Sequence, residues 1–452
     1  MIELKKLSIN GFRCFSTKSS IDFGKITLLT GANSSGKSSF MYSLLGLLQT
    51  EGVPYTYSLN GEYVKLGDYL AIANNHDGNK EIELDIELVD GRVPYEVIIK
   101  IRKQEEGNMP IVTSLRCKST YFEVNAVGDI NSGLFKADLD YNPSLSPDPN
   151  AQNEALRTER IAYFKDNKQN IEKSRVDFIV SYLSAIGQEI HAKNALVDAS
   201  TQEYDGSYEK YLVLTDVFIS IGHLFDEFNE KFNFISSYRM PPERSYIETQ
   251  VPNKIGPDGN GFVNTLLKWE ESETGKFNEL VSALRLLSIL DYVHVDKLPG
   301  GSFNVNVKVK ENGTTTPLSD VGFGVSQMLP IILADVQLGA ESTLYAAQPE
   351  IHLHPSVQAD YGSYLVHEVA KSNKRYIIET HSEYLINRIR LEIVKKNISS
   401  DDVKVFFIGE KDGISTITQI TFTEDGRILD APADFLKTYM IDVMSIAMEA
   451  AE

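Results

Sequence analysis

The amino-terminal 30 residues alternate between apolar and polar positions and end in a run of apolar and small residues. Leu4, Leu7 and Ile9 open the alternation, and residues 26–30 form the closing run. A period of two is typical of a β-strand, because its successive side chains point to opposite faces. The pattern therefore predicts short strands over residues 2–30.

Residues 39–49 form the next apolar segment, in which Gly46 is the one potential breaker. The large apolar side chains recur without the alternation of a strand, which predicts a largely buried helix. A loop with two glycines, residues 31–38, lies between the last strand and this helix.

From residue 55 to residue 125 the alternation returns, most clearly over residues 81–88. It predicts an antiparallel β lobe. Residues 130–175 are polar, and residues 142–150 are their clearest loop because they contain three prolines. Helical spacing over residues 176–232 then predicts an inserted helical region.

The carboxyl-terminal third is organised differently. Short apolar strands are predicted at residues 342–347 and 375–379, with helical segments between them. Strands that alternate with helices are typical of a parallel sheet. Before this region, residues 277–290 predict a helix, and Asn312-Gly313 is a hairpin signal. The whole pattern predicts an α/β fold with an antiparallel β lobe, a parallel core sheet and a helical insertion.

Composition places the chain among ordinary globular proteins. Of its 452 residues, 42% are hydrophobic and 24% are charged. No segment approaches the roughly 18 consecutive apolar residues of a membrane span, and the start of the chain lacks the layout of a secretory signal. We therefore expect a cytoplasmic protein. Its two cysteines, Cys14 and Cys117, exclude a disulfide framework and a cysteine-based zinc module.

The formal net charge is −19 at pH 7. A protein that covers nucleic acid through many phosphate contacts normally carries an excess of Lys and Arg. The charge therefore disfavours extensive coating of DNA, although it stays compatible with a local basic stripe on one face.

Residues 31–38 read Gly-x4-Gly-Lys-Ser, the pattern of a phosphate-binding loop. Successive backbone N–H groups of such a loop surround phosphate oxygens, and the following helix directs its positive end at the ligand. Lys37 is expected to reach the β and γ phosphates of ATP, and the Ser38 hydroxyl is expected to bind Mg²⁺. The predicted nucleotide-binding residues of this segment are Asn33, Ser34, Ser35, Gly36, Lys37, Ser38 and Ser39.

Three later segments carry a family resemblance. Residues 318–327 (LSDVGFGVSQ) resemble the signature segment of ABC-class P-loop ATPases. Residues 347–355 (AQPEIHLHP) resemble a Walker B strand end that continues into a D-loop, and residues 379–382 (ETHS) are similar to a switch-histidine segment. Within the class, the likeness is to the overcoming-lysogenisation-defect (OLD) and SMC/RecF-type ATPases, whose relatives include ATPases of prokaryotic anti-phage systems.

This resemblance covers residues 1–70 and 235–452 and implies an ABC-type P-loop ATPase fold. Together with the pattern of residues 126–234, which the resemblance does not cover, it predicts four parts. They are residues 1–125 with Walker A and the β lobe, residues 126–234 as polar loop and helical insertion, residues 235–410 with the signature, Walker B, D-loop and switch histidine, and residues 411–452 as a small carboxyl-terminal β/α appendage.

The resemblance also implies an ATP site shared by two chains, with the phosphate loop of one facing the signature segment of the other. His381 is implied to contact the γ-phosphate or the attacking water, Arg13 to approach the nucleotide, and Gln49 to sense Mg²⁺. The signature residues implied to face the partner's γ-phosphate are Ser319, Gly322, Gly324 and Ser326.

One position departs from the family pattern. Relatives end the Walker B strand with an acidic residue where this chain has Ala347, and Gln348 stands where many ABC ATPases keep a general base. A methyl group holds neither the water shell of Mg²⁺ nor the attacking water, and an amide accepts no proton. We therefore hypothesise that the chain binds ATP and hydrolyses it slowly or not at all. One interpretation is that a glutamate at position 347 was replaced to trap the ATP-bound state, and the alternative is a natural variant in which Glu350 acts instead.

Other residues have more than one interpretation. His352 and His354 lie two positions apart and, with His381, offer three metal ligands, although a dimer-interface loop is the favoured interpretation. Arg239 and Arg244 flank a Pro-Pro pair. Three roles are open for them: contact with the nucleotide, contact with a partner, or ion pairs on the surface.

The leading functional hypothesis is the ATPase subunit of a cytoplasmic assembly. It is a homodimer or a higher even-numbered homo-oligomer that controls a separate, nuclease-like effector in bacterial anti-phage defence. The apolar side of residues 436–447 is a candidate docking face for that effector. The alternative is a DNA-repair or chromosome-maintenance ATPase that clamps nucleic acid, and a transporter ATPase is disfavoured by the long insertions.

Overall fold

The computed structural model describes residues 2–50, 52, 54, 57–104, 107–128, 135–141, 207–433 and 435. The predicted loop at residues 142–150, the start of the predicted helical insertion and the candidate docking face at residues 436–447 lie outside the described residues. The chain divides into two compact units, Met1–Lys18 with Tyr42–Phe228 and Ser19–Met41 with Asn229–Glu452.

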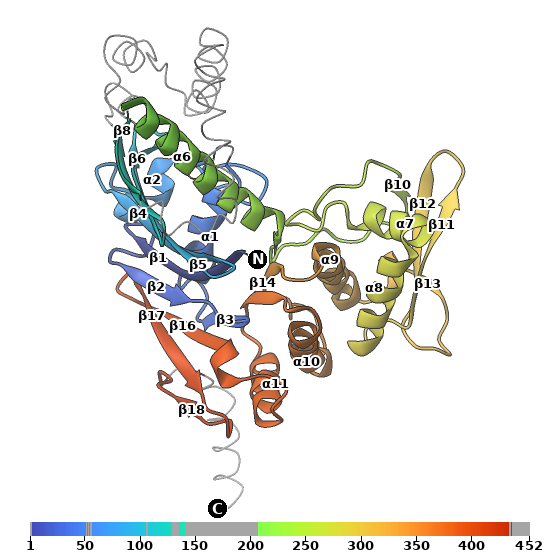
Figure 1. Cartoon of the computed structure of the whole chain (residues 1–452). Helices are drawn as coiled ribbons and strands as arrows, with labels where there is room; N and C mark the ends of the chain where they lie inside the picture. Colours follow the sequence, from blue (N-terminus) through green and yellow to red (C-terminus); the bar gives the residue numbers. More distant parts are fainter. Residues whose placement is uncertain are drawn as a thin grey trace, which may run out of the picture. The chain divides into compact units, whose positions relative to one another are not determined.

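The first unit is built on an antiparallel lobe (Figure 1). Its strands follow one another in the sheet as β1 (Ile2–Asn10), β4 (Ile82–Asp90), β5 (Val93–Lys103), β6 (Pro110–Ser119), β7 (Phe122–Gly128) and β8 (Phe135–Tyr141). In β4 the alternate residues Ile82, Leu84 and Ile86 are fully buried, because the period of two turns one face toward the core. The predicted lobe is confirmed, and β8 extends it into the stretch that was predicted to be polar loop.

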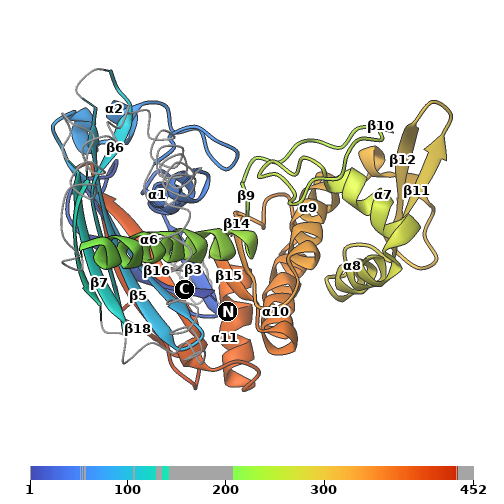
Figure 2. The same cartoon turned by 45° about the horizontal axis from the view of Figure 1, so that its top comes forward.

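The first unit also contains helices. They are α2 (Tyr69–Ile72), the 3-10 turn η1 (Asn74–His76) and α6 (Ser207–Glu230), and α6 runs across the strands of the lobe (Figures 1 and 2). The helix α1 (Lys37–Leu48) begins in the second unit and continues into the first. Its Leu44, Leu45 and Leu47 are fully buried, which confirms the predicted buried helix.

The second unit contains a mixed sheet whose centre is parallel. In sheet order its strands are β18 (Ile428–Leu429), β17 (Ile414–Phe422), β16 (Val403–Lys411), β3 (Ile26–Gly31), β15 (Arg375–Glu379), β14 (Thr343–Ala347) and β9 (Phe232–Ile235). The five strands from β16 to β9 are parallel to their neighbours, and β17 is antiparallel to β16. The carboxyl ends of the five parallel strands therefore meet at one edge, where ligands of α/β sheets bind.

The predicted alternation of short apolar strands with helices is confirmed in this part of the chain. β14 and β15 coincide with the predicted strands, and the helices α9 (Phe323–Leu338), α10 (Pro355–Ser372) and α11 (Glu383–Val394) pack with them in one hydrophobic core. Ser382 caps α11 by accepting a hydrogen bond from the backbone N–H of Leu385. The second unit also contains the short strand β2 (Ser19–Asp22) and the turn η4 (Ser400–Asp402).

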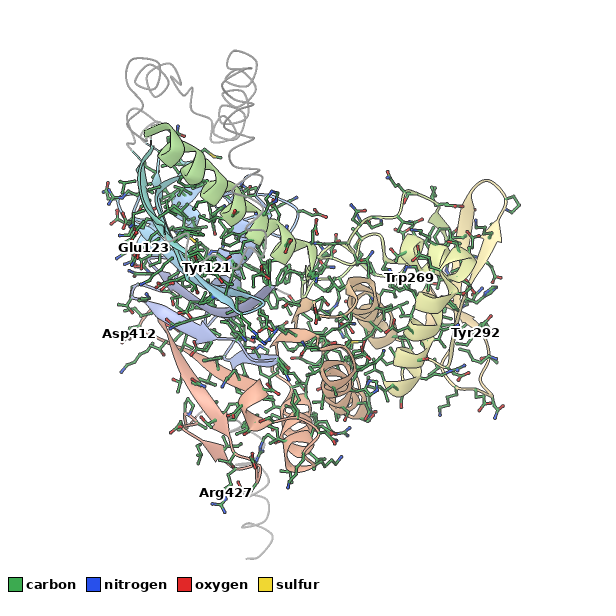
Figure 3. All side chains as sticks on the ribbon, viewed as in Figure 1. Tyr121, Glu123, Trp269, Tyr292, Asp412 and Arg427 are labelled. Carbon is green, nitrogen blue, oxygen red and sulfur yellow. The ribbon has the colours of Figure 1, made fainter. Side chains whose placement is uncertain are left out.

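A small sheet, two helices and a 3-10 turn lie between β9 and α9 in the chain. They are β10 (Tyr246–Ile247), α7 (Phe262–Ser272), α8 (Thr274–Leu286), β11 (Tyr292–Leu298), β12 (Ser302–Lys308), β13 (Thr316–Pro317) and the turn η3 (Leu318–Asp320). Trp269 of α7 is buried in the core of this unit (Figure 3). Strands β12 and β13 pair on either side of Asn312-Gly313, as predicted. A second hairpin joins β11 to β12 through Gly300 and Gly301, both at positive φ.

The described part of residues 411–452 continues the core sheet. Strand β17 pairs with β16, and β18 pairs with β17. The strands of the predicted appendage are therefore hydrogen-bonded, through β16, to the sheet that carries the phosphate loop.

Candidate functional site

The phosphate loop follows β3 at the carboxyl edge of the core sheet. Gly31 has a φ of 138°, and a Cβ atom there would lie 2.0 Å from the carbonyl oxygen of Ile408. Gly36 has a φ of 101° and Ser34 a φ of 61°. Both glycines therefore occupy conformations that a side chain would strain, which is the requirement that the Gly-x4-Gly pattern expresses.

Lys37, the first residue of α1, points back into this loop. Its Nζ donates to the carbonyl oxygens of Gly31 at 3.1 Å and Ala32 at 2.6 Å. Burial lowers the pKa of Lys37, whereas the carboxylates of Glu379 and Glu350 oppose that shift. The ammonium is thus held inside the loop by neutral acceptors, which a phosphate replaces with a stronger charged partner.

Ser38 is bound by a carboxylate from the far end of the sequence. Its hydroxyl lies 2.9 and 2.8 Å from the two carboxylate oxygens of Glu379, the last residue of β15. The Tyr345 hydroxyl donates to the same carboxylate at 3.1 Å. Burial raises the pKa of Glu379, and the hydrogen bond from Ser38 and the charge of Lys37 oppose the shift.

Glu379 is a site residue that was not predicted. The sequence placed it at the start of the switch-histidine segment without a role of its own. The only signal is that an acidic residue ends a buried apolar strand. Its position beside Ser38 follows from strand register, because Glu379 pairs with Leu29 of β3 on one side and with Ala347 of β14 on the other.

Ala347 and Gln348 end β14 beside this carboxylate. Ala347 is buried, and the backbone N–H of Gln348 donates to the carbonyl oxygen of Glu379 at 2.7 Å. Gln348 has a φ of 48°, so the chain turns sharply there. The position expected to be acidic therefore lies at the site and offers only a methyl group.

Glu350 and His381 contact each other at the same edge of the sheet. The backbone N–H of His381 donates to the Glu350 carboxylate at 2.6 Å. Burial raises the pKa of Glu350, and burial together with the charge of Lys37 lowers the pKa of His381. The predicted catalytic residues Ala347, Gln348, Glu350 and His381 are thus brought to one edge, with Lys37 and Ser38.

The residues at this edge fit ATP with Mg²⁺. Among the described residues, the Ser35 hydroxyl and one carboxylate oxygen of Glu350 are buried without a hydrogen-bond partner. Ser38 and Glu379 offer the hard oxygen atoms that Mg²⁺ prefers, and Mg²⁺ is usually held by one or two carboxylates together with phosphates. These residues would hold the phosphates and the metal.

The metal site suggested for His352, His354 and His381 finds no support. In the described part of the chain, no three His, Cys, Asp or Glu side chains form a group able to hold a metal ion. His354 instead caps α10, where its ring nitrogen accepts from the backbone N–H of Ser356 at 3.3 Å.

The predicted signature residues lie where η3 leads into α9. Gly322 is the amino-terminal cap of α9 and is exposed, whereas Ser326 is buried and bonds the carbonyl oxygen of Phe323 at 3.0 Å. A Cβ atom at Gly324 would lie 2.5 Å from the carbonyl oxygen of His352, so the signature helix touches the predicted D-loop. Ser319 bonds Asp320 at 3.2 Å.

The two arginines have different environments. Arg239 is buried, and burial lowers its pKa to about 10. Arg244 is exposed and pairs with Asp320 at 2.9 Å, which ties the loop before the small sheet to the signature segment. Arg239 is therefore a buried residue of the site, whereas Arg244 forms an ion pair on the surface.

Arg13 and Gln49 belong to the first unit. The Arg13 guanidinium lies over the rings of Phe12 and Tyr42, at 5.9 and 5.7 Å from their centroids. The Gln49 amide donates to the carbonyl oxygen of Ser58 at 2.9 Å and accepts from backbone N–H groups of the following loop. Their predicted roles toward nucleotide and Mg²⁺ stay predictions.

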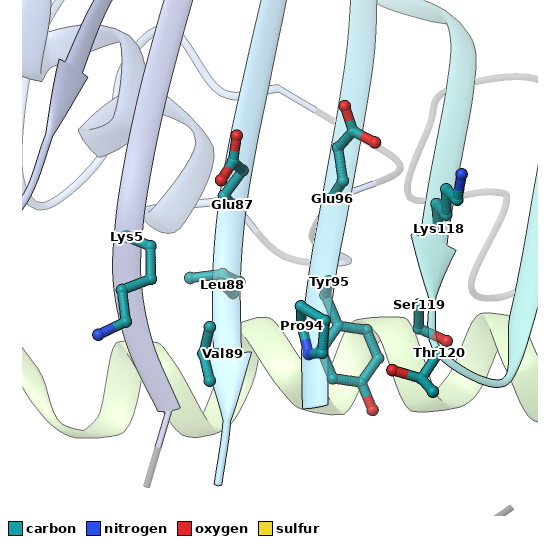
Figure 4. Close-up of a pocket in the computed structure, with 10 residues that line it drawn as sticks. All are labelled: Lys5, Glu87, Leu88, Val89, Pro94, Tyr95, Glu96, Lys118, Ser119 and Thr120. Atoms are coloured by element: carbon teal, nitrogen blue, oxygen red, sulfur yellow. The ribbon is translucent and has the colours of Figure 1, made fainter. Parts of the chain in front are cut away.

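A separate hollow of about 420 Å³ lies on the lobe of the first unit (Figure 4). Charges of both signs, from Lys5, Glu87, Glu96 and Lys118, stand on neighbouring strands around it. None of the described helices is long and apolar enough to cross a membrane.

Comparison with known proteins gives one family. A family model described as an AAA ATPase domain matches residues 2–239 and 260–386, which is more than half of the chain. No curated protein matches the chain.

Solved structures of SMC head domains are distantly similar. The Smc head domain of Pyrococcus furiosus, with an extended coiled coil and bound to the C-terminal domain of ScpA, has 12% identity over 100% of both chains and a TM-score of 0.43. The SMC head domain of Thermotoga maritima has 11% identity over 92% of this chain and 98% of that chain, with a TM-score of 0.39. The Smc head domain of Pyrococcus yayanosii, with a coiled coil and joint, has 12% identity, full coverage of both chains and a TM-score of 0.42.

Proposed function

The chain belongs to the AAA ATPase domain family, and from this premise we propose that it binds ATP with Mg²⁺ at the loop of residues 31–38. The observation that supports the proposal is the arrangement of Lys37 and Ser38. One carries a buried ammonium inside the glycine loop, and the other carries a hydroxyl held by a carboxylate at the same edge.

Hydrolysis is slow in this proposal. Ala347 offers no carboxylate, and Gln348 offers an amide that accepts no proton from water. Glu350 is the remaining acidic side chain of the predicted catalytic set, and the backbone N–H of His381 holds one of its oxygens. The site is therefore better equipped to bind ATP than to hydrolyse it.

Two copies are proposed to enclose ATP between the phosphate loop of one and the signature segment of the other. Phe323, at the start of α9, is 59% exposed beside the exposed Gly322, which supports a surface that a second chain covers. ATP then sets the shape of the homo-oligomer, and that shape holds or releases a separate nuclease-like effector in a cytoplasmic anti-phage system.

Steady-state turnover of the purified chain and of Ala347→Glu tests this function. We expect barely measurable turnover in the wild type and a rise on the order of 100-fold in the variant, because a positioned carboxylate restores acid–base help. Lys37→Ala, measured by calorimetric ATP titration, is expected to abolish binding. Turnover of about 10 per second in the wild type, or no gain in Ala347→Glu, would contradict slow hydrolysis.

A further inference from the structure

A metal-bound nucleotide needs a carboxylate near Ser38, and position 347 does not provide one. We propose that Glu379 provides it: its carboxylate orients Mg²⁺ beside Ser38 in place of an acidic side chain at position 347. The inference rests on the proposed ATP binding and adds a metal-positioning residue to it.

Strand register places Glu379 for this role. In the parallel pairing of β14 with β15, Ala347 lies directly beside Glu379. Tyr345 lies two residues before Ala347, so the two side chains share a face of the sheet, and the Tyr345 hydroxyl reaches the Glu379 carboxylate. The methyl group of Ala347 and the carboxylate of Glu379 therefore lie on the same face at the end of adjacent strands.

The contacts of Glu379 are those of a metal-positioning group. Both of its carboxylate oxygens lie within 3 Å of the Ser38 hydroxyl, the group expected to bind Mg²⁺. Such a bond is typical of the shell that orients a metal ligand. The positive charge of Lys37, the residue before Ser38, favours the ionised form of this carboxylate by opposing the rise in pKa that burial causes.

The carboxylate is also fixed before any ligand arrives. Glu379 is 3% exposed, and Tyr345, which binds it, stacks on Phe234 of β9 with ring centroids 4.7 Å apart. A side chain whose rotamer is held by packing and hydrogen bonds loses little freedom when it orients a metal.

Glu350 is the other acidic candidate at this edge, and its contacts differ. One of its oxygens accepts from the backbone N–H of His381, which directs it to the switch-histidine segment. Glu379 instead binds the hydroxyl beside Lys37. The two carboxylates thus serve different parts of the site, and metal binding survives the loss of acidity at position 347.

The test compares ATP affinity in Mg²⁺ with ATP affinity in EDTA, by calorimetric titration of the full chain. The ratio of the two dissociation constants measures what the metal contributes, independently of turnover. Glu379→Gln removes the charge but keeps the shape. Glu341→Gln makes the same change at an exposed residue just before β14, at the opposite edge of the sheet.

We expect Mg²⁺ to tighten ATP binding by the wild type and by Glu341→Gln. In Glu379→Gln this gain falls about 10- to 100-fold, while the affinity in EDTA is kept. Adding Ala347→Glu to Glu379→Gln is expected to restore part of the gain, because it returns a carboxylate to the adjacent strand.

The inference is overturned if Mg²⁺ tightens ATP binding by Glu379→Gln as much as it does in the wild type. It is also overturned if the variant loses the same ATP affinity in Mg²⁺ and in EDTA. A wild type that binds ATP equally well with and without Mg²⁺ overturns it as well. A wild type that binds no ATP in either buffer overturns the proposed function instead. If circular dichroism shows that Glu379→Gln does not fold, Glu379→Asp is the variant to test. Its shorter side chain withdraws the carboxylate from Ser38, and we expect the gain in affinity from Mg²⁺ to fall several-fold. An unchanged gain would refute the role of Glu379.

Discussion

Arg239 shows how a single buried side chain joins two parts of the site. Its guanidinium donates to the carbonyl oxygens of Ala347 at 3.4 Å and Gln348 at 3.1 Å, and to the Gln327 amide oxygen at 3.3 Å. Gln327 belongs to α9, directly after the signature residue Ser326. Arg239 therefore connects the end of the Walker B strand with the signature helix.

Removal of Arg239 is expected to destabilise the protein markedly. Arg239→Ala leaves buried carbonyl groups without a donor, and we expect the free energy of unfolding to fall by about 3 kcal/mol. Urea denaturation measures this change. Arg244→Ala is the control, because that side chain is exposed, and its ion pair with Asp320 is worth less than about 1 kcal/mol. Equal losses in the two variants would refute the bracing role of Arg239.

At the scale of elements, the start of α9 is packed against the predicted D-loop through a glycine. Gly324→Ala puts a Cβ atom 2.5 Å from the backbone carbonyl of His352, which cannot move away as a flexible side chain does. We expect a loss of about 1–3 kcal/mol and weaker ATP-dependent dimerisation. Thermal unfolding and light scattering measure the two effects.

Gly322→Ala is the matched control for stability. A Cβ atom at Gly322 meets nothing within 4 Å, and the φ of −53° suits any residue. We expect its unfolding free energy to stay within about 0.5 kcal/mol of the wild type. A Gly324→Ala protein as stable as Gly322→Ala would show that the backbone around the contact between α9 and the D-loop can shift without a loss of unfolding free energy.

The pairing of α7 with β11 makes stability depend on pH. His294 of β11 lies 2.5 Å from the Glu270 carboxylate of α7 and 3.1 Å from Asp296, and the hydrogen bond to Glu270 is the main reason why the pKa of His294 is raised. A raised pKa in the folded state adds stability that is complete below the unfolded value of about 6.5 and is lost as pH rises through the folded value.

His294→Gln is expected to remove this part of the pH dependence. The difference in unfolding free energy between wild type and variant should shrink as pH rises from about 6 to about 8, by less than about 1 kcal/mol because the pair is partly exposed. Urea titrations at several pH values measure it. A difference that stays constant over this range would contradict the role of His294.

The local pattern of the sequence predicted most of the strands and helices, whereas the pairing of distant strands determined which side chains meet at the site. The loop of residues 31–38 and the strands at 342–347 and 375–379 were legible because each signal is contained in a few residues. The pairing of Ser38 with Glu379 joins positions 341 residues apart, so no spacing in the sequence reveals it. Arg239 was ambiguous because arginine is usually exposed, and its burial depends on acceptors from β14 and α9.

For the whole molecule, the family match confirms the predicted resemblance at the level of a P-loop ATPase and confirms the α/β fold class. The phosphate loop and the residues at the ends of β14 and β15 that face it lie in the second unit. The core sheet of that unit is built from segments at both ends of the chain, since β3 lies between β15 and β16. A truncation before residue 411 would therefore remove the described strands β17 and β18 that extend this sheet.

The net charge of −19 bears on the alternative that the protein clamps nucleic acid. A surface that neutralises many phosphates releases counterions, so its affinity falls steeply with salt. We expect this chain, with and without ATP, to bind a short DNA duplex more weakly than about 1 μM near physiological salt. Fluorescence anisotropy between about 50 and 200 mM salt measures both affinity and slope. Tight binding in ATP with a slope steeper than about −4, which corresponds to four or more phosphate contacts, would favour the nucleic-acid clamp over control of a separate effector.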